Sequence, residues 1–180
     1  MPLDVYVLVE AIWLILPAYA ANGLIPIFRG KHPIDFNKKF FDRQPILGKG
    51  KSWEGLVFAC IIGIVIALIQ AFAYPFLPWD LSPIQLTIVP MTATLGFLLG
   101  FGAVIGDMVG SFIKRRLKLQ RGRPAPLLDQ EDFLLGALLF ASFIIAIKIE
   151  WVIILLILTP IIHFVASFVG YKIRLKREPY

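Results

Sequence analysis

Residues 96–118, GFLLGFGAVIGDMVGSFIKRRLK, join an apolar helical segment to a block of positive charge. Between Gly96 and Ile113 the only polar side chains are Asp107 and Ser111. The glycines recur at four-residue spacing, a pattern that lets two helix backbones approach closely. A carboxylate at membrane depth is costly, so Asp107 is a candidate functional residue. The stretch therefore predicts a membrane helix that ends in a polar site.

The composition of the whole chain also indicates a membrane protein. Of 180 residues, 58% are hydrophobic and 17% are charged, whereas soluble domains have roughly half and a quarter. The excess lies in five apolar segments that suit a hydrocarbon core about 30 Å thick, the fourth being short. We place these segments at residues 5–27, 55–77, 84–112, 133–147 and 151–171. The sequence predicts an all-α integral membrane protein with five transmembrane helices in one domain, residues 1–180.

The basic residues predict the orientation in the membrane. Seven Lys or Arg lie in loop 28–54, six in loop 113–132 and four after residue 171, and Lys148 is the only other one. Positive charge is enriched in cytoplasmic loops. Five spans then put the N-terminus outside, and both loops and the C-terminus in the cytoplasm. Topology thus accounts for the net charge of +6, and we expect no nucleic-acid partner.

Two segments have unusual lengths. The third, 84–112, is longer than a straight crossing needs, and we expect Pro90 to kink it. The fourth is separated from the fifth only by residues 148–150, which predicts a tight helical hairpin. The glycine face of the third segment permits a homodimer, but it equally serves packing within one chain.

One helical face at the end of the third segment carries four polar side chains: Asp107, Ser111, Lys114 and Arg115. They would form a polar stripe that descends to the cytoplasm. Alternatively, Asp107 only pairs with Lys114 or Arg115 near the membrane surface. Arg116 and Lys118 are most simply interpreted as topology determinants and anchors for lipid headgroups.

Acidic residues follow beside these cations. Asp129, Glu131 and Asp132 directly precede the fourth segment, where one alternative is that they only cap the helix. Carboxylates that hold Mg²⁺, beside cations that contact phosphate, are the groups needed for phosphoryl or nucleotidyl transfer. Loop 28–54 repeats the combination with Asp35, Asp42, Lys49 and Lys51. Its GKGKS stretch lacks the spacing of a P-loop, but it is a cationic loop able to approach a polyphosphate.

The stretch GDMVGSFIKRR…RG…PAP…DQED resembles the signature of the CTP:phosphatidate cytidylyltransferases, the CDP-diacylglycerol synthase superfamily. The matching positions are Asp107, Ser111, Lys114, Arg115, Asp129 and Asp132. GKGKSWEG resembles an upstream element of the same superfamily, and LPAYAANGLIP and HPIDF resemble its archaeal branch. The likeness runs from about Leu16 to Asp132. The His-Gly-Gly of the bacterial signature is absent, Gln130 replaces an arginine, and the chain is short, all of which favours the archaeal branch.

The resemblance implies that CTP reacts with an unsaturated, prenylated archaeal glycerol-phosphate lipid to give a CDP-linked lipid and pyrophosphate. It implies Mg²⁺ at Asp107, Asp129 and Asp132, with Lys114 also catalytic. The expected substrate-binding residues are Asn22, Asp35, Asp42, Lys49, Lys51, Ser111 and Arg115. CTP would enter from the cytoplasm, while the prenyl chains stay between helices. A small transporter or channel, or a scaffold that binds anionic lipid, is the alternative from another class; no internal repeat supports a transporter.

Overall fold

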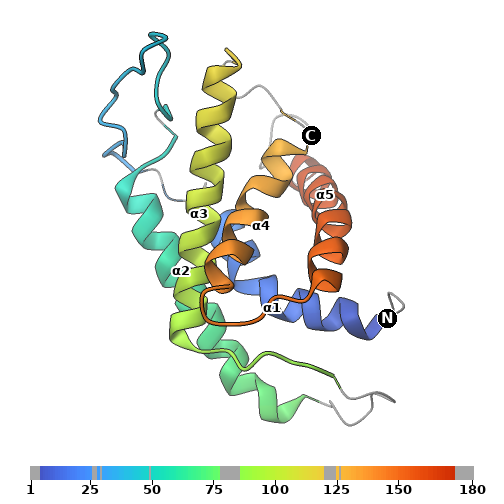
Figure 1. The fold of residues 1–180 in the computed structure, drawn as a ribbon. Helices are drawn as coiled ribbons and strands as arrows, with labels where there is room; N and C mark the ends of the chain where they lie inside the picture. Colours follow the sequence, from blue (N-terminus) through green and yellow to red (C-terminus); the bar gives the residue numbers. More distant parts are fainter. Residues whose placement is uncertain are drawn as a thin grey trace.

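The computed structural model of the chain is an arrangement of α-helices (Figure 1). The described residues are 5–25, 28, 30–48, 50–77, 86–119, 125 and 127–172, with only the backbone described at 5 and 166–171. Within these ranges there is no β-strand, only two isolated bridges, Pro33–Ser52 and Lys39–Pro45. The predicted all-α class is therefore confirmed.

The helices are α1 (Val5–Leu24), α2 (Trp53–Ala73) with the short 3-10 helix η2 (Tyr74–Phe76), α3 (Ala93–Arg116), α4 (Leu128–Ala141) and α5 (Ile149–Lys172). By length and composition, three stretches suffice to cross a membrane: Tyr6–Leu24, Trp53–Phe76 and Ala93–Arg116. Ile149–Val165 in α5 is a shorter apolar stretch. The helices thus follow the predicted order, and three of the five have the apolar length of a span.

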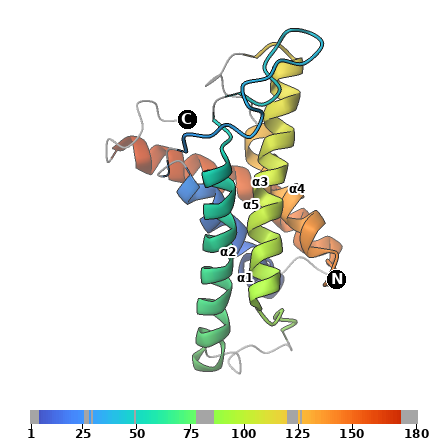
Figure 2. The same cartoon turned by 90° about the vertical axis from the view of Figure 1, so that its left-hand side faces the viewer.

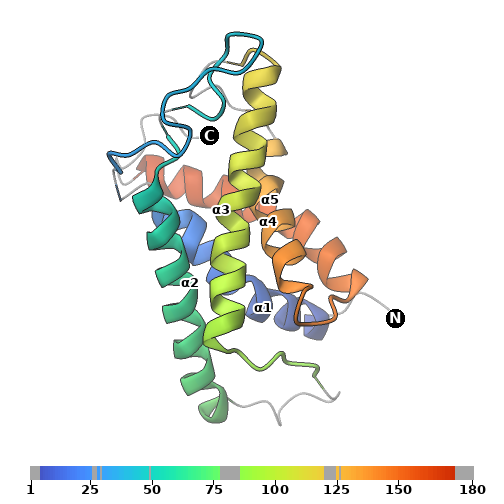
Figure 3. The same cartoon turned by 60° about the vertical axis from the view of Figure 1, so that its left-hand side comes forward.

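Helix α3 is central, with α2 along one side and α4 along the other (Figures 1 and 3). A Cβ atom at Gly100 would lie 2.5 Å from the carbonyl oxygen of Ala59 in α2. A Cβ atom at Gly102 would lie 2.6 Å from the carbonyl oxygen of Gly136 in α4. The predicted close approach of helix backbones is confirmed, and this close packing occurs within one chain. Helices α1 and α5 cross the direction of α2 and α3 (Figure 2).

The predicted bounds of the third segment, 84–112, are wrong at both ends. Residues 86–92 are not helical, and α3 begins at Ala93, where the Thr92 hydroxyl accepts a 3.1 Å hydrogen bond from the Leu95 amide. Pro90 therefore precedes the helix and does not kink it. At the other end α3 continues to Arg116, because cations in the last turn favour the negative end of the helix dipole.

Helix α4 begins and ends earlier than the predicted 133–147. It starts at Leu128. Three residues before this start, the Ala125 amide donates a 2.9 Å hydrogen bond to the carboxylate of Asp129 in the first turn. It ends at Ala141, and residues 142–148 connect it to α5. The predicted three-residue hairpin connection is therefore wrong.

The buried carboxylate of Glu10 connects α1 to two other parts of the chain. Its carboxylate accepts hydrogen bonds from the Thr87 amide at 2.5 Å, and from the Lys148 ammonium and the Trp151 indole at 2.8 Å each. A buried carboxylate needs such partners to offset its lost hydration. These bonds fix the segment before α3 and the start of α5 against α1.

Pro17 lies inside α1 and explains a contact with α2. Proline has no amide hydrogen, so Pro17 cannot donate the helical hydrogen bond to the carbonyl of Trp13, which lies one turn earlier. The side-chain amide of Gln70 in α2 donates to that carbonyl at 2.7 Å. The buried Gln70 thus satisfies a backbone acceptor that the proline leaves free.

Candidate active site

A cavity of about 610 Å³ lies between the C-terminal part of α3 and the loop that joins α1 to α2. This loop and the C-terminal end of α3 lie at the same end of the molecule (Figure 2). Among the described residues that line the cavity, five side chains are cationic, and one, Asp35, is acidic. The cations are Lys39, Lys51, Lys114, Arg115 and Lys118. A concave site with this charge attracts a multiply charged anion.

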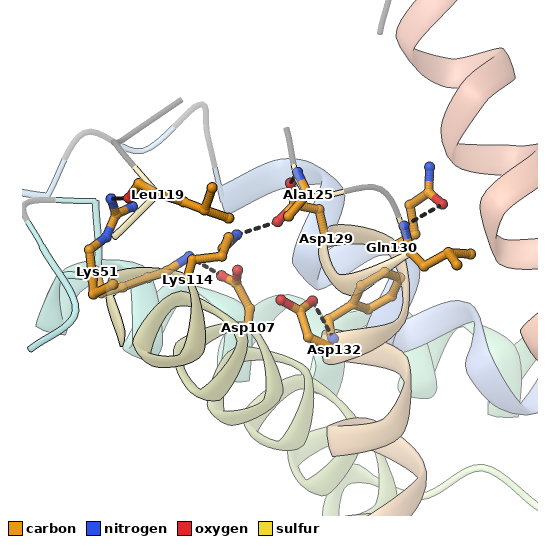
Figure 4. Close-up of polar contacts among 11 residues, drawn as sticks. Lys51, Asp107, Lys114, Leu119, Ala125, Asp129, Gln130 and Asp132 are labelled. Carbon is orange, nitrogen blue, oxygen red and sulfur yellow. Dashed lines mark hydrogen bonds and ion pairs between the residues drawn. The ribbon is translucent and has the colours of Figure 1, made fainter. Parts of the chain in front are cut away.

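The polar face of α3 forms one wall of the cavity, as helical spacing predicts. Ser111, Lys114 and Arg115 all line it. Asp107, one turn earlier, forms an ion pair with Lys51 of the loop (Figure 4). The alternative that Asp107 pairs with Lys114 or Arg115 is wrong, because the loop supplies its partner from another part of the chain.

Lys114 connects α3 to α4 through an ion pair with Asp129 (Figure 4). The other carboxylate oxygen of Asp129 accepts the bond from Ala125 described above. Asp129 therefore stabilises the start of α4 and also faces the cations of α3. The capping and functional interpretations of this acid both agree with the structure.

Asp132 lies against α3 at a point where a glycine leaves room for it. Any side chain at Gly110 would collide with the Asp132 carboxylate. The Oδ1 atom accepts a 2.7 Å hydrogen bond from the Phe133 amide, whereas Oδ2 is buried with no hydrogen-bond partner among the described residues. Figure 4 shows the carboxyl groups of Asp107 and Asp132 turned toward each other. Two helices thus present three carboxylates to one region.

The donor set fits a magnesium ion that is completed by phosphate oxygens. In the described part of the chain, no three His, Cys, Asp or Glu side chains lie close enough together to hold a metal ion by themselves. Mg²⁺ usually binds one or two carboxylates together with waters and substrate phosphates rather than a full protein cage. The buried, unpartnered Oδ2 of Asp132 is the kind of atom that such an ion would satisfy.

Asp35 shapes the loop from inside. Its buried carboxylate accepts hydrogen bonds from the amides of Gly48 at 2.9 Å and of Leu47 and Asn37 at 3.0 Å each. Burial alone would raise the pKa of Asp35, but the three amide donors outweigh it and hold the pKa below its usual value. Asp35 lines the cavity and also determines the conformation of its wall.

The remaining predicted site residues have different positions. Asn22 lies in α1, and among the described residues it is not part of the cavity lining. Asp42 is also outside the lining and forms a 2.9 Å ion pair with Arg116. Lys49 lies outside the described residues. The structure therefore brings Lys51 and Asp35 to the cavity lining, together with Ser111, Lys114 and Arg115 of α3. Asp107, Asn22 and Asp42 are not part of this lining.

Sequence reasoning missed two connecting side chains. Arg116, interpreted as a headgroup anchor, instead lies over the rings of Phe40 and Phe112, 4.7 and 4.8 Å from their centroids. No sequence signal joins Arg116 to Asp42, because 74 positions separate them. Glu10 did have a signal, since it is a carboxylate within an apolar helix, as Asp107 is.

The fold and the cavity define an α-helical membrane protein with a cation-lined site at one end of its central helix. The family described as CarS-like CDP-archaeol synthase matches residues 4–180. The chain belongs to the CDP-archaeol synthase family. The predicted membership of the archaeal branch is therefore confirmed, and so is the enzyme class, a lipid-phosphate cytidylyltransferase.

Individual relatives agree over nearly the full length. The CDP-archaeol synthase of Methanocaldococcus jannaschii is 40% identical, over 94% of this chain and 95% of its own. That of Pyrococcus horikoshii is 43% identical, over 96% and 97%. A solved structure described as an intramembrane enzyme for archaeal membrane lipid biosynthesis is 34% identical, with a TM-score of 0.75 over 88% of this chain and 93% of that one. These likenesses favour an enzyme over a transporter or a scaffold.

Proposed function

We propose that the chain transfers the cytidylyl group of CTP to the phosphate of an unsaturated archaeal ether lipid, 2,3-bis-O-geranylgeranylglycerol 1-phosphate, giving CDP-archaeol and pyrophosphate. The observation that carries the proposal is the cation-lined cavity beside Asp107, Asp129 and Asp132. Family membership supports it, because curated members are named for this product. The cavity offers positive charge for a triphosphate, and the carboxylates offer oxygen ligands for its metal.

The chemistry requires positioning more than proton transfer. An oxygen of the lipid phosphate attacks the α-phosphorus of CTP, and a new phosphorus–oxygen bond forms. The bond from the α-phosphorus to the oxygen that bridges to the β-phosphate breaks, and its electron pair leaves with pyrophosphate. The lipid phosphate is already ionised near neutral pH, so no strong general base is needed. The barrier is the approach of two anions and the charge that develops on pyrophosphate.

The cationic side chains match these demands. Lys51, Lys114 and Arg115 line the cavity and would contact phosphate oxygens, and the buried hydroxyl of Ser111 would add a donor. The lysine ammonium groups are on flexible stems, so Lys51 and Lys114 can exchange a carboxylate for a phosphate. We expect Lys49, next to the same wall in sequence, to extend this set.

Asp107, Asp129 and Asp132 would hold Mg²⁺, directly or through water, together with phosphate oxygens of CTP. When bound, the ion supplies positive charge that stabilises the transferring phosphoryl group. The chain's own contribution is to present carboxylates from α3 and α4 at a fixed separation. That separation depends on the glycine contacts between the two helices.

We further propose that the chain crosses the membrane five times, with the N-terminus outside and the site in the cytoplasm. The distribution of Lys and Arg supports this orientation. Helix α4 has 14 residues, fewer than the about 20 of a full crossing, so the apolar residues 142–147 would complete it. In a variant without Cys60, a cysteine at Lys38 should react with an impermeant maleimide only in opened cells, and one at Glu150, at the start of α5, in intact cells. The reverse pattern would contradict the orientation.

The reaction is tested with purified protein in detergent, by measuring CDP-lipid and pyrophosphate. Wild type should need CTP, lipid phosphate and Mg²⁺ together, and no product with all three present would refute the proposed reaction. Asp107→Asn should lose most of the activity while its thermal unfolding is unchanged. Glu150→Gln, which removes a carboxylate at the start of α5, serves as the matched control. A folded Asp107→Asn protein with undiminished activity would exclude Asp107 from the site.

A further inference from the structure

Arg116, the last residue of α3, holds the loop between α1 and α2 by three contacts. Its Nη1 donates to the Asp42 carboxylate at 2.9 Å, and its Nη2 donates to the carbonyl oxygen of Pro45 at 2.5 Å. The guanidinium also contacts the rings of Phe40 in the loop and Phe112 in α3. The arginine is mostly shielded from solvent, whereas the loop residues it binds are more exposed. Arg116 thus fastens an exposed loop to a helix end.

The loop that Arg116 holds is a wall of the cavity. Gln44 and Pro45 line the cavity, whereas Arg116 itself does not. The turn is closed by its own backbone: the Phe40 amide donates to the Gln44 carbonyl at 2.8 Å, and the Ile46 amide donates to the Lys38 carbonyl at 3.2 Å. Because these hydrogen bonds join the two sides of the turn, a contact at Pro45 also restrains the neighbouring wall residues.

Among the described residues, the turn also meets α3 where the ring of Phe40 packs edge-on against Phe112, with centroids 5.4 Å apart. Residues 36–43 are all exposed, and Phe41 is 95% exposed. Segments with little buried apolar surface open at low free-energy cost. The Arg116 contacts are therefore a large share of what keeps the wall closed against α3.

We propose that Arg116 is a positioning residue for the nucleotide: it keeps the loop closed, so that the affinity for CTP depends on it while the chemical step does not. This inference rests on the proposed function, because it takes CTP as the occupant of the cavity. When only a fraction of molecules has the wall closed, the apparent dissociation constant rises in inverse proportion to that fraction. Arginine suits the role, since its planar group reaches two acceptors while it stacks on rings, which a lysine cannot do.

The first test compares Arg116→Met with Arg43→Met. Arg43 belongs to the same loop, and its exposed side chain has no hydrogen-bond or ion-pair partner among the described residues, so the control removes the same charge. Losing a charge-assisted hydrogen bond and two cation–π contacts should weaken CTP binding roughly 10- to 100-fold by calorimetry. The KM for CTP should rise by a similar factor, with kcat and the KM for lipid phosphate unchanged. Arg43→Met should match wild type.

A second set of variants separates positioning from a general structural role. Asp42→Asn keeps the oxygen that accepts the Gln44 amide and removes only the charge. In combination with Arg116→Met it should add no further loss of CTP affinity, and Arg116→Lys should fall between wild type and Arg116→Met. Hydrogen exchange of the amides in 38–46 should be faster in Arg116→Met and unchanged in Arg43→Met.

The outcomes distinguish this inference from the proposed function. A fall in kcat with an unchanged KM for CTP, additive losses in the double variant, or unchanged hydrogen exchange of the loop would each overturn the role of Arg116. If Arg116→Met does not fold, the same criteria apply to Asp42→Asn and Arg116→Lys. A wild-type protein that does not bind CTP would refute the proposed function, whatever the loop does. Faster exchange in Arg116→Met would then still show that Arg116 holds the loop.

Discussion

Gly102 of α3 sets the distance between α3 and α4, and replacing it by alanine tests this spacing. The new Cβ atom would lie 2.6 Å from the Gly136 carbonyl oxygen and 2.9 Å from the Phe140 Cβ atom. Ordinary contact begins at 3.4 Å, and 3.4 minus 2.6 leaves about 0.8 Å for the helices to separate. The nearest atom belongs to the backbone and has no rotamer to change. Overpacking of this kind costs about 1–3 kcal/mol.

The separation should affect the site as well as stability. Asp129 and Asp132 are on α4, whereas Asp107 and Lys114 are on α3, so moving the helices apart moves the carboxylates apart. A misplacement near 1 Å can reduce a rate roughly 100-fold. We expect the kcat of Gly102→Ala for CDP-lipid formation, at saturating CTP and lipid phosphate, to fall roughly 10- to 100-fold. Thermal unfolding in detergent reports the stability of the same sample.

Gly23→Ala is the matched control, because a Cβ atom at Gly23 in α1 would meet nothing within 4 Å. Both variants gain up to about 1 kcal/mol from the higher helix propensity of alanine, so their difference isolates the packing cost. Gly23→Ala should be as active as wild type and no less stable. If Gly102→Ala retains the kcat and the unfolding midpoint of Gly23→Ala, the spacing argument is wrong.

Three further predictions concern the loop between α1 and α2 and the hydrogen bonds that Glu10 and Trp13 of α1 accept. The Asp35 carboxylate has a lowered pKa, so its stabilisation of the loop is complete above the unfolded value of 3.8 and is lost as the pH falls through the lower folded value. Pepsin, normalised on an unstructured peptide, should therefore cut the wild-type loop faster as the pH falls below 3.8, and Asp35→Asn at a rate that does not change there. Lys148→Met leaves the buried Glu10 without its cation and should lower the free energy of unfolding by about 3 kcal/mol, more than Glu10→Gln does; equal losses would contradict this. Gln70→Leu removes the side-chain amide that donates to the Trp13 carbonyl and should cost about 1–3 kcal/mol in thermal unfolding, so an unchanged midpoint would exclude the role of that bond.

The features that the sequence predicts correctly are local in the chain. The face that carries Ser111, Lys114 and Arg115 follows from helical periodicity alone. The glycine spacing predicts close helix contacts, because only backbone geometry is involved. The helix ends were harder, since α3 begins where the Thr92 hydroxyl caps it rather than where the apolar run begins. Hydropathy is an average over many residues and indicates which segment lies in the membrane. A helix cap is a single hydrogen bond, which such an average does not detect.

The pairings that build the site are distant in sequence. Lys51 meets Asp107 across 56 positions, and Arg116 meets Asp42 across 74. Such pairs depend on how the loop folds over the helix end, and this in turn depends on the amides that Asp35 collects. Periodicity carries no information about a loop of this kind, so the sequence could not predict which residues of the loop pair with Asp107 and Arg116.

The two lysine–carboxylate pairs explain how the chain holds three acids in one region. Asp107 and Asp129 each have a lysine partner, Lys51 and Lys114, which limits the repulsion among the carboxylates. In the proposed reaction the triphosphate would attract the lysines while its metal attracts the carboxylates, so each charge exchanges one partner for another. Asp132 has no lysine partner among the described residues, and its buried Oδ2 has no hydrogen-bond partner there. In the proposed reaction a bound cation would be the partner of this oxygen. Under the proposed function, the site would therefore take a cation and an anion together, because either one alone would leave charges of one sign without partners.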